Sequence, residues 1–348
     1  MHGTYSEDKA SAAPAQPLTG IPNIDIAPFL AGSPEGRAKV VTEVKRACEE
    51  VGFFMISGHG VPLSLIEGIR NVTYRFFNQS IEEKLKSKSD PSVVGSSGFE
   101  IMGTTALARS IGKNTPPDYR EAYKIGVTVP ADDPYYQKPE AKKFFQPNVW
   151  PSNPEDFRPT YEAYYKAVES LAADVMRIFA LALDLDEHFF ADKMDHAVAK
   201  LNAIFYLPQT EPPAEGQLRA GEHTDYGTLT ILLAEDKPGG LQVKMRSGQW
   251  VDVRPPNDAF VVNIGDMMMH WTNDHWLSNL HRVTNPPRES AHIPRLSIVL
   301  FQKPNYDAEI KCIEQYAGKA SAPKYKTVIA GEHWYAKNEK ARPVTKVR

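Results

Sequence analysis

Cysteine is scarce in this chain of 348 residues, which contains 2, Cys48 and Cys312. Two thiols are too few for a disulfide framework or for a metal site built from thiolates. The sequence also lacks any apolar run of about 18 residues, the length that a membrane-spanning helix needs. Residues 1–20 hold no apolar segment of the kind found in secretory signals. We therefore expect a cytoplasmic protein with no membrane partner.

A large excess of charge of one sign is absent as well. Lys and Arg number 40, and Asp and Glu number 43, which gives a formal net charge of −3. Proteins that bind nucleic acid usually carry a basic excess, so no nucleic-acid partner is expected. Hydrophobic residues make up 42% of the chain and charged residues 24%, which is ordinary for a globular protein. The length is sufficient to bury a sizeable core.

The first half of the chain has the periodicity of helices. Apolar residues recur at intervals of three and four over residues 37–51, 63–86 and 155–186, which predicts a helix in each range. In the last range the apolar face is wide, which is typical of a scaffold helix that packs on the core.

After Lys200 the pattern changes to short runs rich in β-branched and aromatic residues, separated by Gly, Pro, Asn and Asp. The runs cover residues 203–206, 229–233, 241–244, 250–253, 260–264, 281–283 and 296–302. Such a series is typical of a jelly roll with two sheets. We also expect a packed strand at Met267–Met269, after Gly265-Asp266.

These patterns predict an α+β fold, in which a jelly-roll core is flanked by N-terminal helices. Four segments are expected. They are a disordered lead-in at 1–20, a mainly helical N-terminal module at 21–197, a β core at 198–305, and a C-terminal segment at 306–348 that packs on the core.

The chemistry of the chain is indicated by His223-Thr224-Asp225. Successive side chains of a strand point to opposite faces, so His223 and Asp225 lie on the same face and can reach one cation. This pair alone is a weak signal, because His-x-Asp is common by chance. His281 opens a later β-rich run and supplies a third ligand. Two histidines and one carboxylate on one side of a metal suit non-haem Fe(II) that binds further ligands on its open side.

A second constellation is Arg295-x-Ser297, whose side chains also share a strand face. An Arg guanidinium can donate two parallel hydrogen bonds to a carboxylate, and the Ser hydroxyl adds a third donor. A diacid such as 2-oxoglutarate, bound to iron through its 2-oxo acid, needs such a clamp for its distal carboxylate. Tyr206, on the strand before the metal segment, is a further candidate donor.

With these residues identified, the chain resembles the Fe(II)/2-oxoglutarate-dependent oxygenases of the isopenicillin N synthase-like family over roughly residues 21–305. The resemblance is carried by motifs in a fixed order. They are Ile21-Pro22-x-Ile24-Asp25, Gly52-Phe53-Phe54-x-Ile56-x-Gly58-His59-Gly60-Val61-Pro62, His223-Thr224-Asp225-Tyr226-Gly227-x-Leu229-Thr230, Gly239-Gly240-Leu241-Gln242-Val243, Asn263-Ile264-Gly265-Asp266, His281-Arg282-Val283 and Arg295-x-Ser297. The chain departs from the family's pattern at Ile204, where members often carry Asn, and at Asp274, where they usually carry Gly.

The resemblance implies a distorted double-stranded β-helix with Fe(II) at His223, Asp225 and His281, and 2-oxoglutarate at Arg295, Ser297 and Tyr206. It implies a dioxygenase that uses O2, releases succinate and CO2, and hydroxylates, desaturates or cyclises a small organic substrate. Ascorbate is a candidate reductant, and a monomer or weak homo-oligomer is expected.

The prime substrate is expected to meet loops at 96–125, the loop at 274–278 and the C-terminal segment. Candidate substrate contacts in these regions are Phe99, Arg120 and Trp276. Natural-product or other small-molecule metabolism is the family expectation.

Three alternatives stay open at this point. An iron oxidase of the same fold would not consume 2-oxoglutarate, as in the family's isopenicillin N synthase and aminocyclopropane-carboxylate oxidase members. A ligand sensor would keep the fold without catalysis. A zinc hydrolase would use the two histidines and the aspartate but gives Arg295 and Ser297 no role.

Overall fold

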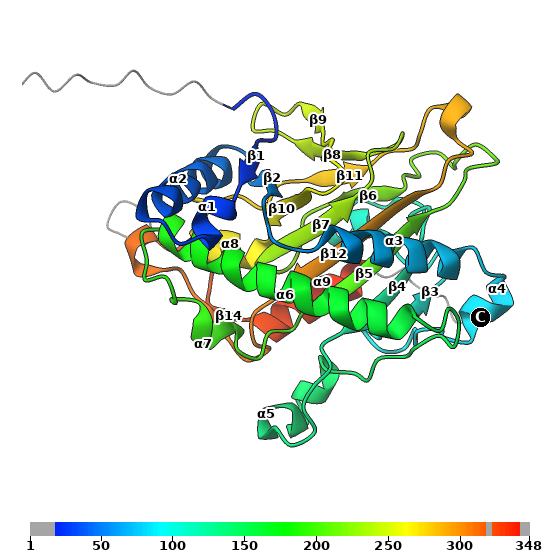
Figure 1. Cartoon of the computed structure of the whole chain (residues 1–348), viewed down its shortest axis with the longest axis horizontal. Helices are drawn as coiled ribbons and strands as arrows, with labels where there is room; N and C mark the ends of the chain where they lie inside the picture. Colours follow the sequence, from blue (N-terminus) through cyan, green and yellow to red (C-terminus); the bar gives the residue numbers. More distant parts are fainter. Residues whose placement is uncertain (1–17, 318–321, 342–348) are drawn as a thin grey trace, which may run out of the picture.

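The core of the protein is a pair of β-sheets, seen in a computed structural model that describes residues 18–317 and 322–341. The larger sheet has the strand order β1-β2-β10-β7-β12-β5-β4-β3, and the smaller has the order β6-β11-β8-β9 (Figure 1). A further pair, β13-β14, lies near the C-terminus. The strands are β1 (Asn23–Asp25), β2 (Phe53–Ser57), β3 (Gly98–Glu100), β4 (Glu121–Gly126), β5 (Lys200–Tyr206), β6 (Ala220–His223), β7 (Leu229–Ala234), β8 (Leu241–Lys244), β9 (Trp250–Asp252), β10 (Phe260–Ile264), β11 (His281–Val283), β12 (Arg295–Gln302), β13 (Glu309–Ile310) and β14 (Val328–Ile329).

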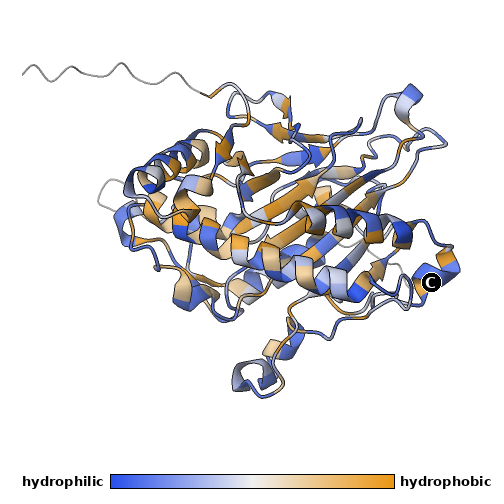
Figure 2. Ribbon diagram, in the orientation of Figure 1, coloured by the Kyte–Doolittle hydropathy of each residue, from blue (hydrophilic) through white to orange (hydrophobic). Residues whose placement is uncertain are grey.

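Helices cover one face of the larger sheet. The α-helices are α1 (Ala27–Leu30), α2 (Pro34–Glu50), α3 (Leu63–Phe77), α4 (Ile81–Leu85), α5 (Pro134–Gln137), α6 (Phe157–Ala182), α7 (Ala191–Met194), α8 (Asp266–Trp271) and α9 (Ala330–Ala341). Short 3-10 turns are η1 (Leu107–Ile111), η2 (Ala141–Lys143), η3 (Arg288–Ser290) and η4 (Glu314–Tyr316). In Figure 1 the long helix α6 crosses in front of the sheet, with α2 and α3 beside it. Figure 2 shows apolar residues concentrated on the central strands.

Local sequence explains the main helices. Helix α2 begins after Ser33, whose side chain accepts a hydrogen bond of 3.1 Å from the amide of Gly36. Val40 and Val44 are buried on its inner face. In α6 the buried residues recur from Phe157 to Ala182, so the helix packs its wide apolar face on the core as expected.

The predicted α+β jelly roll is confirmed, but three local predictions differ from the structure. The helix expected over residues 63–86 is two helices, because the chain turns after Phe77 and Ser80 caps α4. The strand expected at Met267–Met269 is part of helix α8. Here Gly265 lies against the backbone of Gly227, which turns the chain out of the sheet, and methionine is a good helix former.

The alternation argument placed His223 and Asp225 on one strand, but strand β6 ends at His223, and Asp225 lies in the turn after it. Strand β6 is a short run, Ala220-Gly221-Glu222-His223, with low intrinsic β-propensity. Its place in the smaller sheet comes from pairing with β11 rather than from its own residues. Tertiary contacts therefore override the local signal at the strand on which the site depends.

The N-terminal part of the chain contributes directly to the larger sheet, because β1, β2, β3 and β4 form its two edges. The disordered lead-in predicted for residues 1–20 lies outside the described residues up to residue 17. The amide of Leu18 donates a hydrogen bond of 2.6 Å to Glu50. Among the helices of the described ranges, none has both the length and the apolar character needed to cross a membrane.

Candidate active site

Three side chains from separate segments meet between the two sheets. His223 ends β6 and lies opposite His281 of β11 in the strand register. Asp225 follows in the turn after β6. The Nε2 atoms of His223 and His281 lie 4.0 and 3.7 Å from Asp225 Oδ1. One ligand atom from each of the three residues lies within 4.8 Å of the others, so one metal ion can contact all of them.

Backbone contacts orient the two imidazoles. The Nδ1 of His223 lies 2.7 Å from the carbonyl oxygen of Gly221, and the Nδ1 of His281 lies 3.1 Å from that of Asn279. A carbonyl only accepts, so each Nδ1 carries the proton and donates it. In the neutral tautomer that these contacts favour, Nε2 keeps its lone pair and faces the shared centre, which is the arrangement that metal-ligating histidines use.

The carboxylate of Asp225 is divided between two tasks. Its Oδ2 accepts hydrogen bonds of 2.5 Å from Thr230 and 2.7 Å from Asn263. Oδ1 faces the two histidines. Burial alone would raise the pKa of Asp225, but the neighbouring histidines and these two hydrogen bonds hold it below its ordinary value. The group is thus an anion with one oxygen available to a metal.

These donors fit ferrous iron. The three residues are 8%, 5% and 7% exposed, in the order His223, Asp225 and His281. Burial, and then the proximity of His281, lower the pKa of His223, so its imidazole is neutral and able to ligate. Two imidazoles and one carboxylate grouped on one side are the donor set of the facial triad of non-haem Fe(II) oxygenases.

Arg295 and Ser297 lie in the same cavity, on strand β12. Arg295 is 1% exposed. Its guanidinium donates a hydrogen bond of 2.9 Å to Ser297 Oγ and one of 3.1 Å to the carbonyl oxygen of Glu235. Tyr206 of β5 is the register partner of Arg295, and the guanidinium lies 5.4 Å from the centre of its ring. The structure therefore groups the three residues expected to hold a diacid.

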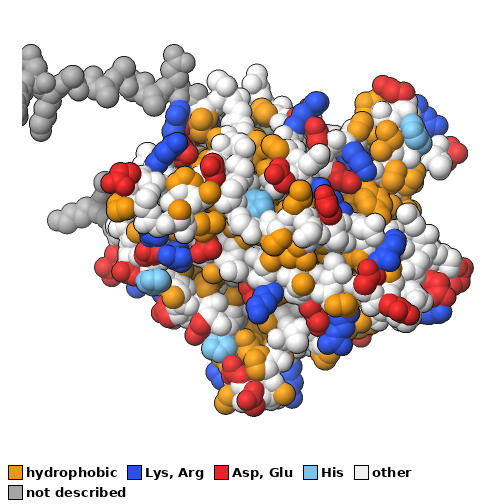
Figure 3. Space-filling view, viewed as in Figure 1, with side chains coloured by type: hydrophobic (Ala, Val, Ile, Leu, Met, Phe, Trp, Pro, Cys, Tyr) orange, Lys and Arg blue, Asp and Glu red, His pale blue; other side chains and the backbone are white. Residues whose placement is uncertain are grey.

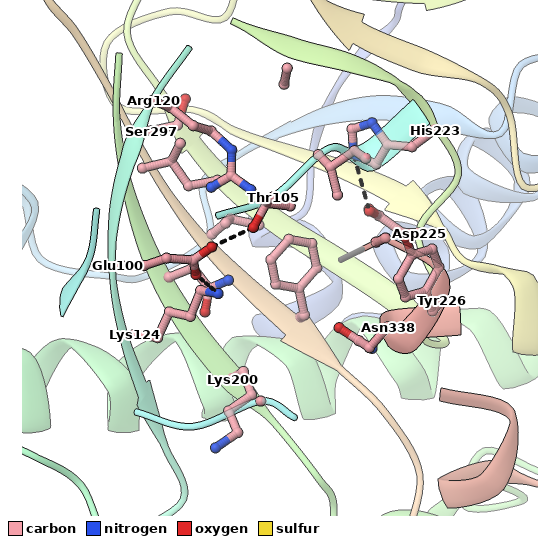
Figure 4. Close-up of a pocket in the computed structure, with 18 of the residues that line it drawn as sticks. Glu100, Thr105, Arg120, Lys124, Lys200, His223, Asp225, Tyr226, Ser297 and Asn338 are labelled. Carbon is pink, nitrogen blue, oxygen red and sulfur yellow. Dashed lines mark hydrogen bonds and ion pairs between the residues drawn. The ribbon is translucent and has the colours of Figure 1, made fainter. Parts of the chain in front are cut away.

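The cavity has a volume of about 500 Å³, within the usual range for small-ligand sites. The three candidate metal ligands and the three candidate 2-oxoglutarate ligands line it, together with the predicted substrate contacts Phe99 and Arg120. Figure 4 shows His223 and Asp225 on one side and Arg120 and Ser297 across from them. The C-terminal helix α9 also contributes lining residues, as expected for the C-terminal segment.

Trp276 does not belong to this cavity, which corrects the expectation that it and the loop at 274–278 contact the substrate. Its side chain is fully buried and packs edge-on against Phe179 of α6, with ring centres 5.2 Å apart. The residue anchors the segment before β11 to the helical layer. The expectation failed because Trp276 is close to His281 in the sequence but its ring packs on the helical layer.

The sequence reasoning also missed charged residues of the cavity. Lys200 and Lys303 both line it, as do the ion-paired residues Glu100 and Lys124. The alternation of side chains along a strand could have predicted that both lysines face the cavity. Lys200 has the same parity as Tyr206 along β5, and Lys303 the same parity as Arg295 along β12, so each shares a face with a candidate 2-oxoglutarate ligand.

Comparisons with known proteins agree with this geometry. Residues 21–153 match the family model for the non-haem dioxygenase in morphine synthesis N-terminal region, and residues 198–304 match that of the 2OG-Fe(II) oxygenase superfamily. The chain is 36% identical to the 2-oxoglutarate-Fe(II) type oxidoreductase hxnY of Emericella nidulans, over 88% of this chain and 86% of that protein. It is 33% identical to homoarginine-6-hydroxylase 2-ODD-C23 of Glycine max, over 92% of this chain and 96% of that protein.

A solved structure has the same architecture. A full-length Neurospora crassa protein in complex with alpha-KG and thymine superposes with a TM-score of 0.77 at 29% identity, covering 92% of this chain and 96% of that one. The chain belongs to the isopenicillin N synthase-like family of 2-oxoglutarate-Fe(II) oxygenases. It is an oxidoreductase, a dioxygenase that acts on a small molecule with Fe(II) and 2-oxoglutarate, and O2 is implied by the reaction.

Proposed function

We propose that His223, Asp225 and His281 hold the Fe(II), and that Arg295, Ser297 and Tyr206 hold the distal carboxylate of 2-oxoglutarate. The observation that carries this assignment is the convergence of the three metal-ligand atoms within 4.8 Å in the wall of the cavity that Arg295 and Ser297 also line. A zinc hydrolase would leave the buried Arg295–Ser297 pair without a task.

The iron, when bound, couples the decarboxylation of 2-oxoglutarate to succinate and CO2 with the oxidation of a substrate C–H bond. The chain positions the reactants. Gly221 and Asn279 fix the two imidazoles, and Thr230 and Asn263 fix the carboxylate. Arg295 supplies a buried positive charge to the co-substrate. The sheets around them exclude water from the reacting centre.

Phe99 and Arg120 are the proposed contacts of the prime substrate. Phe99 of β3 is among the residues that line the cavity, and its fully buried ring packs against Phe76 and Phe77 of α3. Arg120 is 9% exposed, and its Nε lies 3.8 Å from Asp118 Oδ2. The substrate is a small organic molecule of natural-product or other small-molecule metabolism, and its oxidation ends in hydroxylation, desaturation or ring closure.

The wider setting is also a proposal. We place the enzyme in the cytoplasm as a monomer or weak homo-oligomer, with no nucleic-acid or membrane partner and with ascorbate as reductant. The nearly balanced charge of the chain supports the absence of a nucleic-acid partner. On the face shown in Figure 3, acidic and basic side chains are interspersed.

A substrate screen scored by succinate release tests the proposal. The protein is incubated in air with Fe(II), ascorbate, 2-oxoglutarate and single members of a small-molecule library. We expect succinate formation that needs Fe(II), rises with the true substrate, and disappears in Asp225→Ala. Substrate oxidation without consumption of 2-oxoglutarate would instead identify an oxidase of the same fold, and full turnover by Asp225→Ala would refute the metal assignment.

A further inference from the structure

The end of the cavity away from Arg295 carries two buried lysines. Lys200, the first residue of β5, is 7% exposed, and Lys303, the residue after β12, is 3% exposed. Lys200 is the register partner of Phe301, so the two lysines lie on neighbouring strands at the same end of the sheet. Gly126 of β4 gives Lys200 its room, because a Cβ there would lie 2.6 Å from Nζ.

Neither ammonium group forms a salt bridge with a carboxylate among the residues that the structure describes. Within the described residues, Lys200 Nζ has no hydrogen-bond partner. Lys303 Nζ donates one hydrogen bond of 3.1 Å to the carbonyl oxygen of Phe301. The nearby carboxylate of Glu100 is already engaged by Lys124, Thr104 and Thr105. Most of the donor capacity of the two lysines is therefore unused.

Leaving two such groups unpaired in a buried site is unfavourable, because an ammonium group removed from water needs an opposite charge or hydrogen-bond acceptors. Burial lowers the pKa of Lys200 to about 8. Burial and the charge of Lys200 lower the pKa of Lys303 to about 7, although the carboxylate of Asp225 acts in the opposite direction. A bound anion would remove this penalty by supplying the acceptors and the negative charge.

The anion is not the co-substrate. Arg295 pairs with Tyr206 at one end of the β5–β12 ladder, and Lys200 pairs with Phe301 at the other. At the usual rise per residue the two ends are roughly 20 Å apart along the strands. The distal carboxylate of a diacid held at Arg295 therefore does not reach Lys200. Figure 4 shows the same separation, with Glu100 and Lys124 between Ser297 and Lys200.

We propose that Lys200 and Lys303 bind a carboxylate of the prime substrate, so that the enzyme acts on organic acids held by this group with their reacting C–H bond toward the metal triad. The apolar side chains of Val299 and Phe301, which line the wall between, would contact the carbon skeleton. Asn202 lies between Lys200 and Ile204 on the same face, and its Oδ1 has no partner within the described residues. It adds a polar atom for a hydroxyl or amine near the acid. The inference rests on the proposed function.

The test compares acids with their neutral amides on the intact enzyme. Protein loaded anaerobically with Fe(II) and 2-oxoglutarate, which occupies the metal and Arg295, is titrated with benzoate, benzamide, hexanoate and hexanamide. Binding is followed by calorimetry. We expect at least one acid to bind about 10-fold or more tightly than its amide, as charge-assisted hydrogen bonds provide.

Variants assign the preference to the two lysines. In Lys200→Met and in Lys303→Met the acid preference should fall, and in the double variant it should be lost. Lys311→Met, an exposed lysine outside the cavity, is the matched control and should bind as the wild type does. Equal binding of acids and amides, no binding of either acid, or an acid preference that persists in the double variant would each overturn the inference.

This outcome is distinguishable from failure of the proposed function. If the wild type gives no visible charge-transfer band with Fe(II) and 2-oxoglutarate, the metal and co-substrate assignment is wrong. If the band forms in the wild type and in both lysine variants, but acids bind no better than amides, only the carboxylate site is wrong.

Discussion

Asn263 Nδ2, on strand β10 of the larger sheet, donates a hydrogen bond of 2.7 Å to Oδ2 of Asp225. Thr230 donates to the same oxygen. Together they fix which carboxylate oxygen faces His223 and His281, because Oδ2 is occupied and Oδ1 is not engaged by these donors. The geometry of the metal site therefore extends to residues that never touch the metal.

Replacing Asn263 by Ala should weaken Fe(II) binding about 10- to 100-fold, as loss of an outer-sphere partner generally does. The carboxylate of Asp225 would keep its charge but lose part of its orientation. Anaerobic Fe(II) titration measures the effect. Asn305→Ala is a control, because Asn305 is a buried asparagine that bonds Asp195 outside the cavity. Wild-type Fe(II) affinity in Asn263→Ala would contradict this role.

Replacing Arg295 by Ala should raise the KM for 2-oxoglutarate about 10- to 100-fold, since a hydrogen bond to a charged group contributes about 1.5–3 kcal/mol. Arg295→Lys should recover only part of the affinity for 2-oxoglutarate, because lysine keeps the charge but cannot donate two parallel hydrogen bonds to a carboxylate. Succinate release at varied 2-oxoglutarate gives the KM. Arg288→Ala, on η3, serves as a control outside the cavity. An unchanged KM in Arg295→Ala would refute the clamp.

Trp276 should matter for stability and not for substrate affinity. Removing its fully buried ring in Trp276→Ala should lower the free energy of unfolding by about 3–5 kcal/mol. Urea unfolding measures this, and Trp276→Phe should show a smaller loss in the same direction. The KM for a substrate found in the succinate screen should not change in Trp276→Phe. A raised KM with unchanged stability would restore Trp276 as a substrate contact.

Lys200 should make stability depend on pH. Burial lowers its pKa from 10.5 to about 8, so between these values the unfolded chain binds a proton that the folded chain does not. Stability contributed by this residue therefore rises with pH across that window, and the full penalty applies below pH 8. Relative to Lys200→Met, the wild type should gain on the order of 1–3 kcal/mol between pH 7 and pH 10 without ligand. A constant difference in urea unfolding would show that Lys200 titrates normally.

Much of this site follows from strand alternation and the order of the motifs. The spacing of His223 and Asp225 placed them on one face, and the same rule grouped Arg295 with Ser297. Both pairs are close together in the structure, but only Arg295 and Ser297 share a strand, because Asp225 lies in the turn after β6. The partner His281 could be named only through the resemblance and its position in a β-rich run, because no local rule brings two distant strands into register.

What the sequence did not reveal depends on tertiary contacts. Strand β6 has little β-propensity of its own and is held by β11. Trp276 lies close to His281 along the chain, yet its ring faces helix α6. Lysine side chains are usually exposed, so the sequence gives no sign that Lys200 is buried. Its burial depends on the space beside Gly126 and on its position inside the cavity.

The measurement that tests the central claim most directly is an anaerobic titration of the purified protein with Fe(II) in the presence of 2-oxoglutarate, followed by visible absorption. We expect a charge-transfer band that saturates at one Fe(II) per chain, and that is absent from His223→Ala, Asp225→Ala and His281→Ala. A folded wild-type protein that gives no band, or triad variants that give the band unchanged, would contradict the account.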